Sequence, residues 1–221
     1  GVQTCALPIW ESIFVGYRYF DSANRPVLFP FGHGLSYTKF EYTNLTVDDT
    51  RVRCTIKNIG DFGGEEVVQL YIKPEKTNIL RANRELKGFT KIYLEPNEEK
   101  EVMIELDQHT FQYFDTKEDK WVTEQGVYEI QIGSSIEDIR LTESIELEGK
   151  QTSDDELSDR LFNYYNKNIH HISDEEFHHL LGFTPPNPLW DRNKQLGYND
   201  TIAQGKYKKG LGKLLYLITL A

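Results

Sequence analysis

Cysteine is scarce in this sequence, which has only Cys5 and Cys54 among its 221 residues. Two thiols cannot build the disulfide framework of a small secreted domain, so this usage fits a reducing compartment and favours a cytoplasmic location. Long apolar runs are scarce as well. Spanning a bilayer takes about 18 residues, whereas the longest candidate, 211–221, is interrupted by Gly212 and Lys213. We therefore expect no membrane partner.

Positive charge is in the minority. The 25 Lys and Arg residues face 35 Asp and Glu residues, for a formal net charge of -10. A surface of that sign repels phosphate backbones, so we expect no nucleic-acid partner. The sequence also has no glycine-rich phosphate loop, nucleophile elbow or metal-ligand spacing. We therefore expect neither a cofactor nor a metal ion.

The material for a folded core is ample. Hydrophobic residues make up 38% of the chain and aromatic residues 13%, which is too apolar for a disordered polymer. A length of 221 residues suits one core domain with additional pieces. Composition and periodicity divide the chain into four regions, 1–9, 10–37, 38–149 and 150–221.

Residues 1–9 lack the charged start and long apolar stretch of a secretory signal. They resemble translated sequencing-adapter read-through, and we interpret them as an adapter-derived artefact that leaves the true N-terminus outside this sequence. In the next region, residues 14–20 predict a strand without a partner, which would expose unpaired backbone. Residues 24–26 predict a turn, and residues 29–37, where Gly32 and Gly34 flank His33, predict a tight connector.

Residues 40–149 carry a period-two pattern, which places alternate side chains on opposite faces of a strand. Val52, Cys54 and Ile56, for example, alternate with polar neighbours. The pattern predicts about seven strands, the number expected for an immunoglobulin-like β-sandwich. They span 40–47, 51–57, 67–72, 86–94, 101–106, 128–132 and 139–147, with turns predicted at 58–61, 95–98 and 125–126.

Beyond Lys150 the period becomes helical, which predicts a C-terminal α-helical extension on a mainly β fold. Two capping boxes, Ser153 to Glu156 and Ser173 to Glu176, each predict the start of a short helix. Apolar side chains mark the buried face of each helix, and Gly182 ends the second; they are Leu157, Leu161 and Tyr165 in the first, and Phe177, Leu180 and Leu181 in the second. The prolines of 184–188 predict an extended stretch, and a last weak helix runs from Asn199.

Several clusters of titratable residues invite a chemical interpretation. Five pairs of adjacent carboxylates could divide acid and base roles, but neighbours on a strand point to opposite faces and helix starts favour negative charge. We therefore interpret them as structural; they are Asp48 with Asp49, Glu65 with Glu66, Glu98 with Glu99, Asp154 with Asp155, and Glu175 with Glu176.

Histidines are the other candidates. Four of them could bind zinc or copper, but consecutive helical residues diverge by about 100°, so we favour a solvated polar face for His170, His171, His178 and His179. His33 could instead be a substrate contact or a hydrogen-bonding hinge, and we favour the hinge because no nucleophile or acid lies nearby in the sequence.

The strongest functional signal is a resemblance to a known family. Residues 13–21 and 28–40 closely resemble the end of the second catalytic domain and the linker of glycoside hydrolase family 3, the β-glucosidase and β-xylosidase family. Further segments are typical of that family's C-terminal fibronectin type III-like domain, namely 69–71, 85–89, 133–135 and 138–140. One departure is Ser12, which stands where the family commonly has glycine.

The resemblance implies a domain plan. Residues 10–37 would be the end of the α/β catalytic domain and the linker, residues 38–149 the fibronectin type III-like β-sandwich, and residues 150–221 a helical C-terminal extension. It also implies that Tyr17, Arg18 and the connector at 29–37 make the interdomain contacts.

The resemblance further implies that the parent hydrolyses β-glycosidic bonds with retention. In the family an aspartate nucleophile and an acid/base carboxylate lie on domains upstream of this chain. We therefore expect no catalytic residue here, an inactive fragment, and a role as stabilising scaffold. The expected partners are the missing N-terminal catalytic domains and, through the parent, a β-linked oligosaccharide.

Two alternatives remain open. The sandwich could be an independent carbohydrate- or protein-binding module, provided that Tyr71, Tyr93, Tyr113 and Trp121 form an exposed flat patch. The tail could also mediate self-association into a homo-oligomer.

Overall fold

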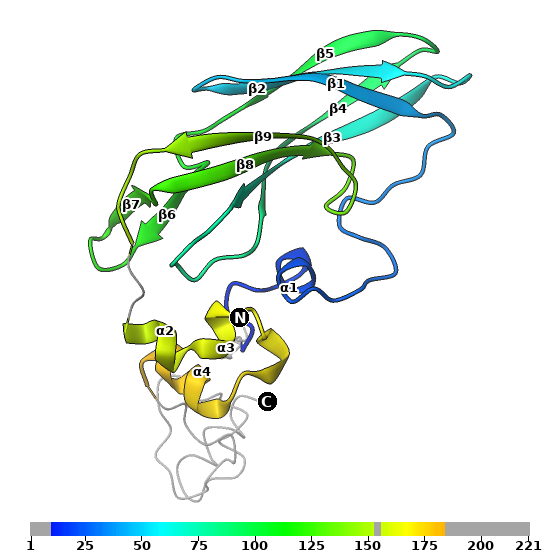
Figure 1. Ribbon diagram of the computed structural model, residues 1–221. Coiled ribbons are helices and arrows are strands. Elements are labelled where there is room, and N and C mark those ends of the chain that lie inside the picture. The colour runs from blue at the N-terminus through cyan, green and yellow to red at the C-terminus, as the bar shows by residue number, and fades with distance from the viewer. Residues whose placement is uncertain (1–9, 153–155, 184–221) are drawn as a thin grey trace, which may run out of the picture. The chain divides into compact units, whose positions relative to one another are not determined.

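The computed structural model describes residues 10–152 and 156–183. The chain divides into two compact units. One comprises Glu11–Glu176, and the other includes Trp10 and the residues from Phe177 onward. The fold is mainly β, as predicted, with two facing sheets followed by short helices in the described part of the chain (Figure 1).

The β-sandwich consists of a three-stranded and a four-stranded antiparallel sheet. The first has the order β1-β2-β5, formed by β1 (Phe40–Val47), β2 (Arg51–Asn58) and β5 (Glu99–Glu105). The second has the order β4-β3-β8-β9, formed by β4 (Glu85–Leu94), β3 (Gly64–Pro74), β8 (Gly126–Gly133) and β9 (Ile139–Leu147). All seven predicted strands are confirmed.

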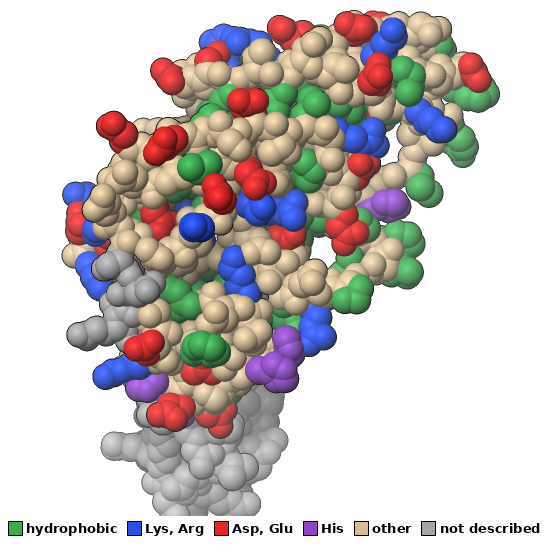
Figure 2. Space-filling view, in the orientation of Figure 1, with side chains coloured by type: hydrophobic (Ala, Val, Ile, Leu, Met, Phe, Trp, Pro, Cys, Tyr) green, Lys and Arg blue, Asp and Glu red, His purple; other side chains and the backbone are tan. Residues whose placement is uncertain are grey.

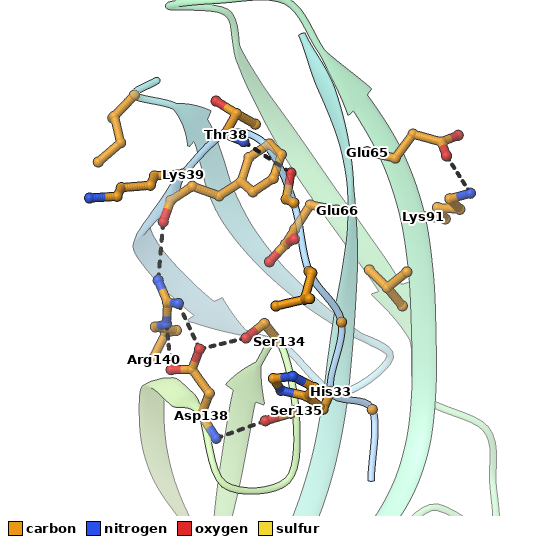
Figure 3. Close-up of a pocket in the computed structure, with 17 residues that line it drawn as sticks. His33, Thr38, Lys39, Glu65, Glu66, Lys91, Ser134, Ser135, Asp138 and Arg140 are labelled. Atoms are coloured by element: carbon orange, nitrogen blue, oxygen red, sulfur yellow. Dashed lines mark hydrogen bonds and ion pairs between the residues drawn. The ribbon is translucent and has the colours of Figure 1, made fainter. Parts of the chain in front are cut away.

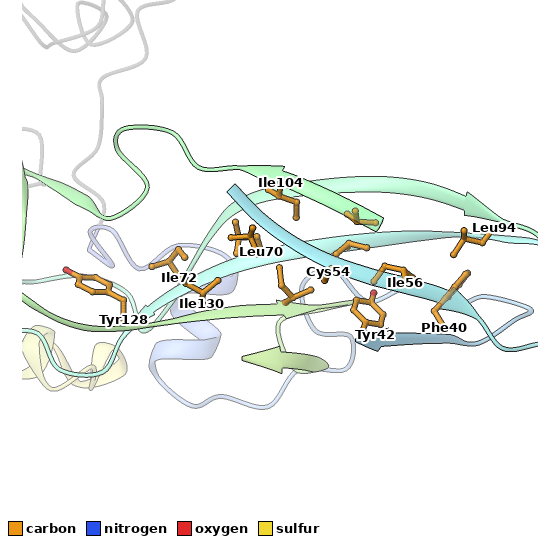
Figure 4. Close-up of a cluster of buried hydrophobic side chains, with 14 residues drawn as sticks. Phe40, Tyr42, Cys54, Ile56, Leu70, Ile72, Leu94, Ile104, Tyr128 and Ile130 are labelled. Atoms are coloured by element: carbon orange, nitrogen blue, oxygen red, sulfur yellow. The ribbon is translucent and has the colours of Figure 1, made fainter. Parts of the chain in front are cut away.

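The core lies between the two sheets and follows the predicted alternation. Its fully buried side chains come from every second position of the central strands, as Figure 4 shows; they include Val52 and Ile56 of β2, Val68, Leu70 and Ile72 of β3, and Ile130 and Ile132 of β8. Burying each such side chain contributes about 1.5–3 kcal/mol, so the alternation selects which face of each strand turns inward.

Gly88 explains one of the family-like segments. It lies in β4, and a Cβ at this position would come within 2.5 Å of Cγ2 of Ile104 on the facing sheet. Real Cβ atoms do not approach a neighbour that closely. The glycine is therefore needed for the two sheets to pack at the observed spacing.

The turn predicted at 58–61 is confirmed, and a buried side chain holds it. Asn58 is inaccessible to solvent. Its Nδ2 donates to the carbonyls of Phe62 (2.8 Å) and Leu94 (3.0 Å), and its Oδ1 accepts from the amide of Gly60 (3.1 Å). One side chain thus satisfies the turn and ties it to β4.

A two-stranded hairpin was not predicted. It consists of β6 (Gln112–Asp115) and β7 (Lys120–Thr123), and Phe114 stands opposite Trp121 across it. Each strand has four residues, too few for a period-two pattern to emerge from the sequence.

The strand predicted at 14–20 is wrong, because residues Tyr17–Ser22 form helix α1. A helix forms here because it brings four polar side chains together. Positions 17, 18, 21 and 22 lie on one face of a helix. All four contact residues 83–86: Tyr17 accepts from the Leu86 amide (2.9 Å), Arg18 pairs with Glu85 (3.4 Å), Asp21 pairs with Arg84 (3.0 Å), and Ser22 accepts from the Asn83 amide (3.0 Å). The orphaned strand that we expected therefore does not exist.

The helical extension is present but more broken than predicted. It contains α2 (Glu156–Arg160), α3 (Phe162–Tyr165), a 3-10 turn (Ile169–His171) and α4 (Asp174–Leu181). The first predicted helix is interrupted at Leu161, which has non-helical backbone angles, and Tyr164 is buried instead of Tyr165.

The second capping box is confirmed in full. The amide of Glu176 donates to Oγ of Ser173 (3.2 Å), and the amide of Ser173 donates to Oε2 of Glu176 (3.1 Å). Gly182, with φ of +74°, ends α4 as predicted. The artefact interpretation of 1–9, the capping serine at 153, the extended stretch at 184–188 and the last helix from Asn199 lie outside the described residues.

Candidate functional site

The connector at 28–39 runs along the sandwich and borders a groove of about 660 Å³ (Figure 3). Backbone bonds fix it at both ends: the Ile136 amide donates to the carbonyl of Phe31 (3.0 Å), and the Ile59 amide donates to that of Lys39 (2.9 Å). Between these points Gly32 adopts φ of +82°, and a Cβ there would overlap the side-chain amide of Gln69. The connector is therefore closely fitted to the sheet beneath it.

An ion pair lines this groove. Nε and Nη2 of Arg140 each lie 2.6 Å from a carboxylate oxygen of Asp138, and Ser134 donates a further bond of 2.6 Å to the same carboxylate. The Arg140 bonds hold the pKa of Asp138 below its usual value. Because Arg140 also donates to the carbonyl of Phe40 (3.1 Å), the pair links β9 to the start of β1.

Glu65 and Glu66, a predicted carboxylate pair, diverge into different surroundings. Glu65 is exposed and pairs with Lys91. Glu66 is partly buried and accepts a bond of 2.6 Å from the hydroxyl of Tyr42, and burial raises its pKa. The interpretation that these two neighbours face opposite sides is confirmed, and both act as structural anchors.

The outward side of the connector is strongly apolar. Leu28, Leu35 and Tyr37 are 88%, 94% and 96% exposed, and Phe29, also exposed, stacks on His33 with ring centroids 5.5 Å apart. Figure 2 shows hydrophobic side chains projecting along this segment. Contiguous exposed apolar residues of this kind mark surfaces that contact another protein surface. We call Leu28, Phe29, Leu35 and Tyr37 the connector patch.

Tyr17 and Arg18, the other predicted interdomain contacts, lie against the connector and the sandwich. The Tyr17 ring stacks on Phe31 (4.5 Å) and meets Tyr71 edge-on (6.5 Å). Tyr71 is thereby fully buried on the outer face of the four-stranded sheet, where its hydroxyl donates to Gln69 (2.6 Å). The segment before the sandwich thus covers a sheet face that would otherwise be solvated.

The burial of Tyr71 rules out the four-ring patch that the binding-module alternative required. Tyr93 lies on β4, whereas Tyr113 and Trp121 lie on the β6–β7 hairpin. Within the hairpin Tyr113 stands opposite Val122, and Trp121 stands opposite Phe114. Tyr113 and Trp121 therefore point to different faces of the hairpin. Tyr93 is exposed on its own strand, and Trp121, 48% exposed, forms a smaller cluster with Phe114 and His109.

The histidines stay apart from any ligand constellation in the described part of the chain. The rings of His170 and His171 lie 4.1 Å apart within the 3-10 turn, and His178 and His179 follow one another on α4. Among residues 10–152 and 156–183, no three His, Cys, Asp or Glu side chains are grouped so that they could hold a metal ion. None of the helices formed by those residues is long and apolar enough to cross a bilayer.

One known domain family matches part of the sandwich. The model of the fibronectin type III-like domain matches residues 66–136, from β3 to the loop after β8. The chain contains a fibronectin type III-like domain. The match lies inside the predicted region 38–149, whose exact boundaries stay a prediction.

Relatives of the chain are much longer proteins. Thermostable β-glucosidase B of Acetivibrio thermocellus is 47% identical over 143 residues, which are 61% of this chain and 19% of the relative. An exo-α-(1->6)-L-arabinopyranosidase of Bifidobacterium breve is 43% identical over 144 residues, 63% of this chain and 19% of the relative. This chain therefore spans about a fifth of the length of these curated relatives.

Solved structures agree with the sequence relatives. The crystal structure of a GH3 β-glucosidase from Bifidobacterium adolescentis has a TM-score of 0.59 and 34% identity, covering 71% of this chain and 25% of that one. The resemblance to glycoside hydrolase family 3 that the motifs indicated is confirmed.

The sequence had not revealed the contact face of α1, although the spacing of positions 17, 18, 21 and 22 was a usable signal.

Proposed function

We propose that this chain is the non-catalytic C-terminal part of a β-glucosidase-like glycoside hydrolase and serves as a scaffold between its domains. The parent would hydrolyse β-glycosidic bonds with retention, using carboxylates outside this chain. The named relatives support a glycosidase, and their different names, glucosidase and arabinopyranosidase, argue that this part does not select the sugar.

The connector patch is the observation that carries the proposal. The connector is bonded to the sandwich through the carbonyls of Phe31 and Lys39. It also presents the four exposed apolar residues of the patch. Burying such side chains against catalytic domains would contribute about 1.5–3 kcal/mol each, which is enough to hold the domains in a fixed relation. The fibronectin type III-like domain would then act as the rigid support of that contact.

A chimera tests this role. Residues 10–149 of this chain would replace the corresponding part of the Acetivibrio thermocellus enzyme, and its thermal inactivation would be compared with that of the truncated enzyme. We expect the chimera to keep activity longer than the truncation, and Leu35→Ser with Tyr37→Ser to shorten its half-life. Met103→Ser is the matched control, since Met103 is exposed on β5 away from the connector.

Two results would contradict the proposal. One is a truncated enzyme as durable as the chimera, which would leave the scaffold without a role. The other is hydrolysis of a β-glucoside by the purified 221-residue chain alone, which would place catalysis within it.

A second function, carbohydrate binding, is favoured by the exposed Trp121 cluster on the hairpin. Half-exposed aromatic rings can stack on sugar rings, and Gln112 and His109 supply polar groups beside Trp121. Titration with cello-oligosaccharides should then quench tryptophan fluorescence, and Trp121→Ala should abolish the response. Phe89→Ala, an exposed ring on β4, is the control. Absence of quenching in the unaltered chain would remove this function.

A further inference from the structure

A small pocket of about 190 Å³ lies where the end of β3 and the following loop meet the segment after α3. Three cationic side chains line it: Lys73 from β3, Arg81 from the loop and Lys167 from the helical extension. These residues are far apart in the sequence, and all belong to the unit Glu11–Glu176. Such a concentration of positive charge is unexpected in a chain whose net charge is -10.

Arg81 is the central group of this pocket. It is only 7% exposed, and among the described residues its Nη1 has no hydrogen-bond partner. A buried donor without an acceptor costs several times more than an ordinary hydrogen bond contributes, and a charged donor costs more still. The unsatisfied Nη1 therefore indicates an acceptor that the described residues do not supply.

The acidic neighbours do not neutralise the cluster. The carboxylate nearest to Arg81 is Glu85 at 3.7 Å, and it is shared with Arg18 at 3.4 Å and Lys87 at 3.0 Å. Lys73 is paired with Glu129 at 3.1 Å, and Glu75 also lines the pocket. The side chains that line the pocket therefore carry three cations and one carboxylate, Glu75.

Lys167 is the third cation of the pocket. Its Nζ donates to Oδ1 of Asn83, which is a neutral acceptor. Burial, followed by the nearby charges of Lys73 and Arg81, lowers the pKa of Lys167, while Asp21 opposes the shift. A like-charge neighbourhood of this kind is stabilised when an anion enters it.

We propose that this pocket binds a small oxyanion through Lys73, Arg81 and Lys167. Its volume lies below the roughly 300 Å³ typical of pockets for drug-sized ligands, which excludes an oligosaccharide. Phosphate, sulfate and a side-chain carboxylate share the required chemistry, because each offers charged oxygen acceptors to guanidinium and ammonium donors. The bound anion joins the sandwich, through Lys73 and Arg81, to the extension, through Lys167. This site is independent of the proposed scaffold function.

Thermal unfolding of the full chain in sodium phosphate, sulfate, acetate or chloride at constant ionic strength tests the site. A ligand that binds only the folded state at ten times its Kd should raise Tm by about 3–6 °C for a protein of this size. We expect that rise in phosphate or sulfate, and its loss in Lys167→Met. Lys120→Met, which removes an exposed lysine of β7 paired with Glu118, should keep the full rise.

The arms of the experiment separate the sources of the oxyanion. A rise in acetate without one in phosphate or sulfate assigns the pocket to a carboxylate from another protein segment. An equal rise in Lys167→Met and in the unaltered chain indicates adventitious ion binding only and overturns the proposal, as does the absence of any rise over chloride. If Lys167→Met fails to fold by circular dichroism, Lys73→Met replaces it under the same criteria.

Discussion

At the scale of single residues, Ser12 shows why a family-like position prefers glycine. Its φ is +56°, in the left-handed region that costs L-residues about 1–2 kcal/mol, and it lies in a turn closed by the Phe14 amide and the Glu11 carbonyl (2.9 Å). The strain comes from the backbone, so the cost is independent of what the Ser12 side chain contacts.

Replacing Ser12 with glycine should therefore stabilise the chain. Relief of the left-handed strain, less the entropy that glycine loses on folding, leaves a gain of about 0.5–1 kcal/mol. Urea unfolding should show a higher midpoint for Ser12→Gly at an unchanged m-value. Ser12→Ala is the control and should show no gain; a gain for alanine equal to that for glycine would refute the backbone explanation.

Glu66 provides a residue-scale prediction about pH. Burial raises its pKa in the folded state above the ordinary value of 4.5, so the folded chain binds more protons than the unfolded chain just above that pH. The contribution of Glu66 to stability is therefore fully present below about 4.5 and is lost as pH rises through the folded pKa.

Glu66→Gln should remove this loss while keeping an oxygen that accepts the Tyr42 hydrogen bond. The difference in unfolding free energy between Glu66→Gln and the unaltered chain should grow in favour of the variant as pH rises from 4 to 7, a range that begins just below the ordinary pKa of 4.5. Parallel stability curves over that range would show that Glu66 is not perturbed. Glu65→Gln, at the exposed neighbouring position, is the matched control.

At the scale of elements, α1 illustrates how a short helix is held by its contacts. Six residues are too few for a stable isolated helix, and the α1 caps carry no side-chain hydrogen bond. The four contacts to residues 83–86 supply the stabilisation instead. Two of them are ion pairs, and the other two satisfy backbone amides, that of Asn83 before β4 and that of Leu86 within it.

Tyr17→Phe tests whether α1 is held to β4 through the Tyr17 hydroxyl. The substitution keeps the ring stacked on Phe31 but leaves the Leu86 amide without its acceptor, at a cost of about 1–3 kcal/mol. Hydrogen exchange should show faster exchange at the Leu86 amide. Tyr19→Phe on the same helix should leave that amide protected; equal exchange rates in both variants would mean that α1 is not docked through Tyr17.

At the scale of the whole molecule, the sandwich depends on the apolar layer between its sheets. Ile130 lies at the centre of that layer, on β8, and is inaccessible to solvent. Its truncation leaves a cavity that rigid sheets cannot collapse to fill.

Ile130→Ala should therefore reduce the unfolding free energy by about 2–5 kcal/mol. Met103→Ala, on the exposed face of β5, should change it by less than about 0.5 kcal/mol. Chemical denaturation of both variants checks the contrast. Similar losses in the two would mean that the layer between the sheets is not the stabilising core.

The sequence by itself determined the parts of the fold that periodicity encodes. Alternation placed all seven sandwich strands and their inward residues, and the reciprocal bonds of Ser173 and Glu176 followed from local spacing alone. Alternation reports one apolar face per strand, so it could not reveal that Gln69 and Tyr71, on the other face of β3, are also buried.

Only the tertiary structure decided what covers that second face and what surrounds Arg81. The covering segment meets Tyr71 through Tyr17, 54 positions earlier by their numbers, and Arg81 meets Lys167 across 86 positions. Contacts between such distant residues depend on how whole elements dock, and local propensity carries no information about that docking. For the same reason the exposure of the connector patch and the existence of the cationic pocket required the tertiary structure, while the sandwich could be predicted from its residues.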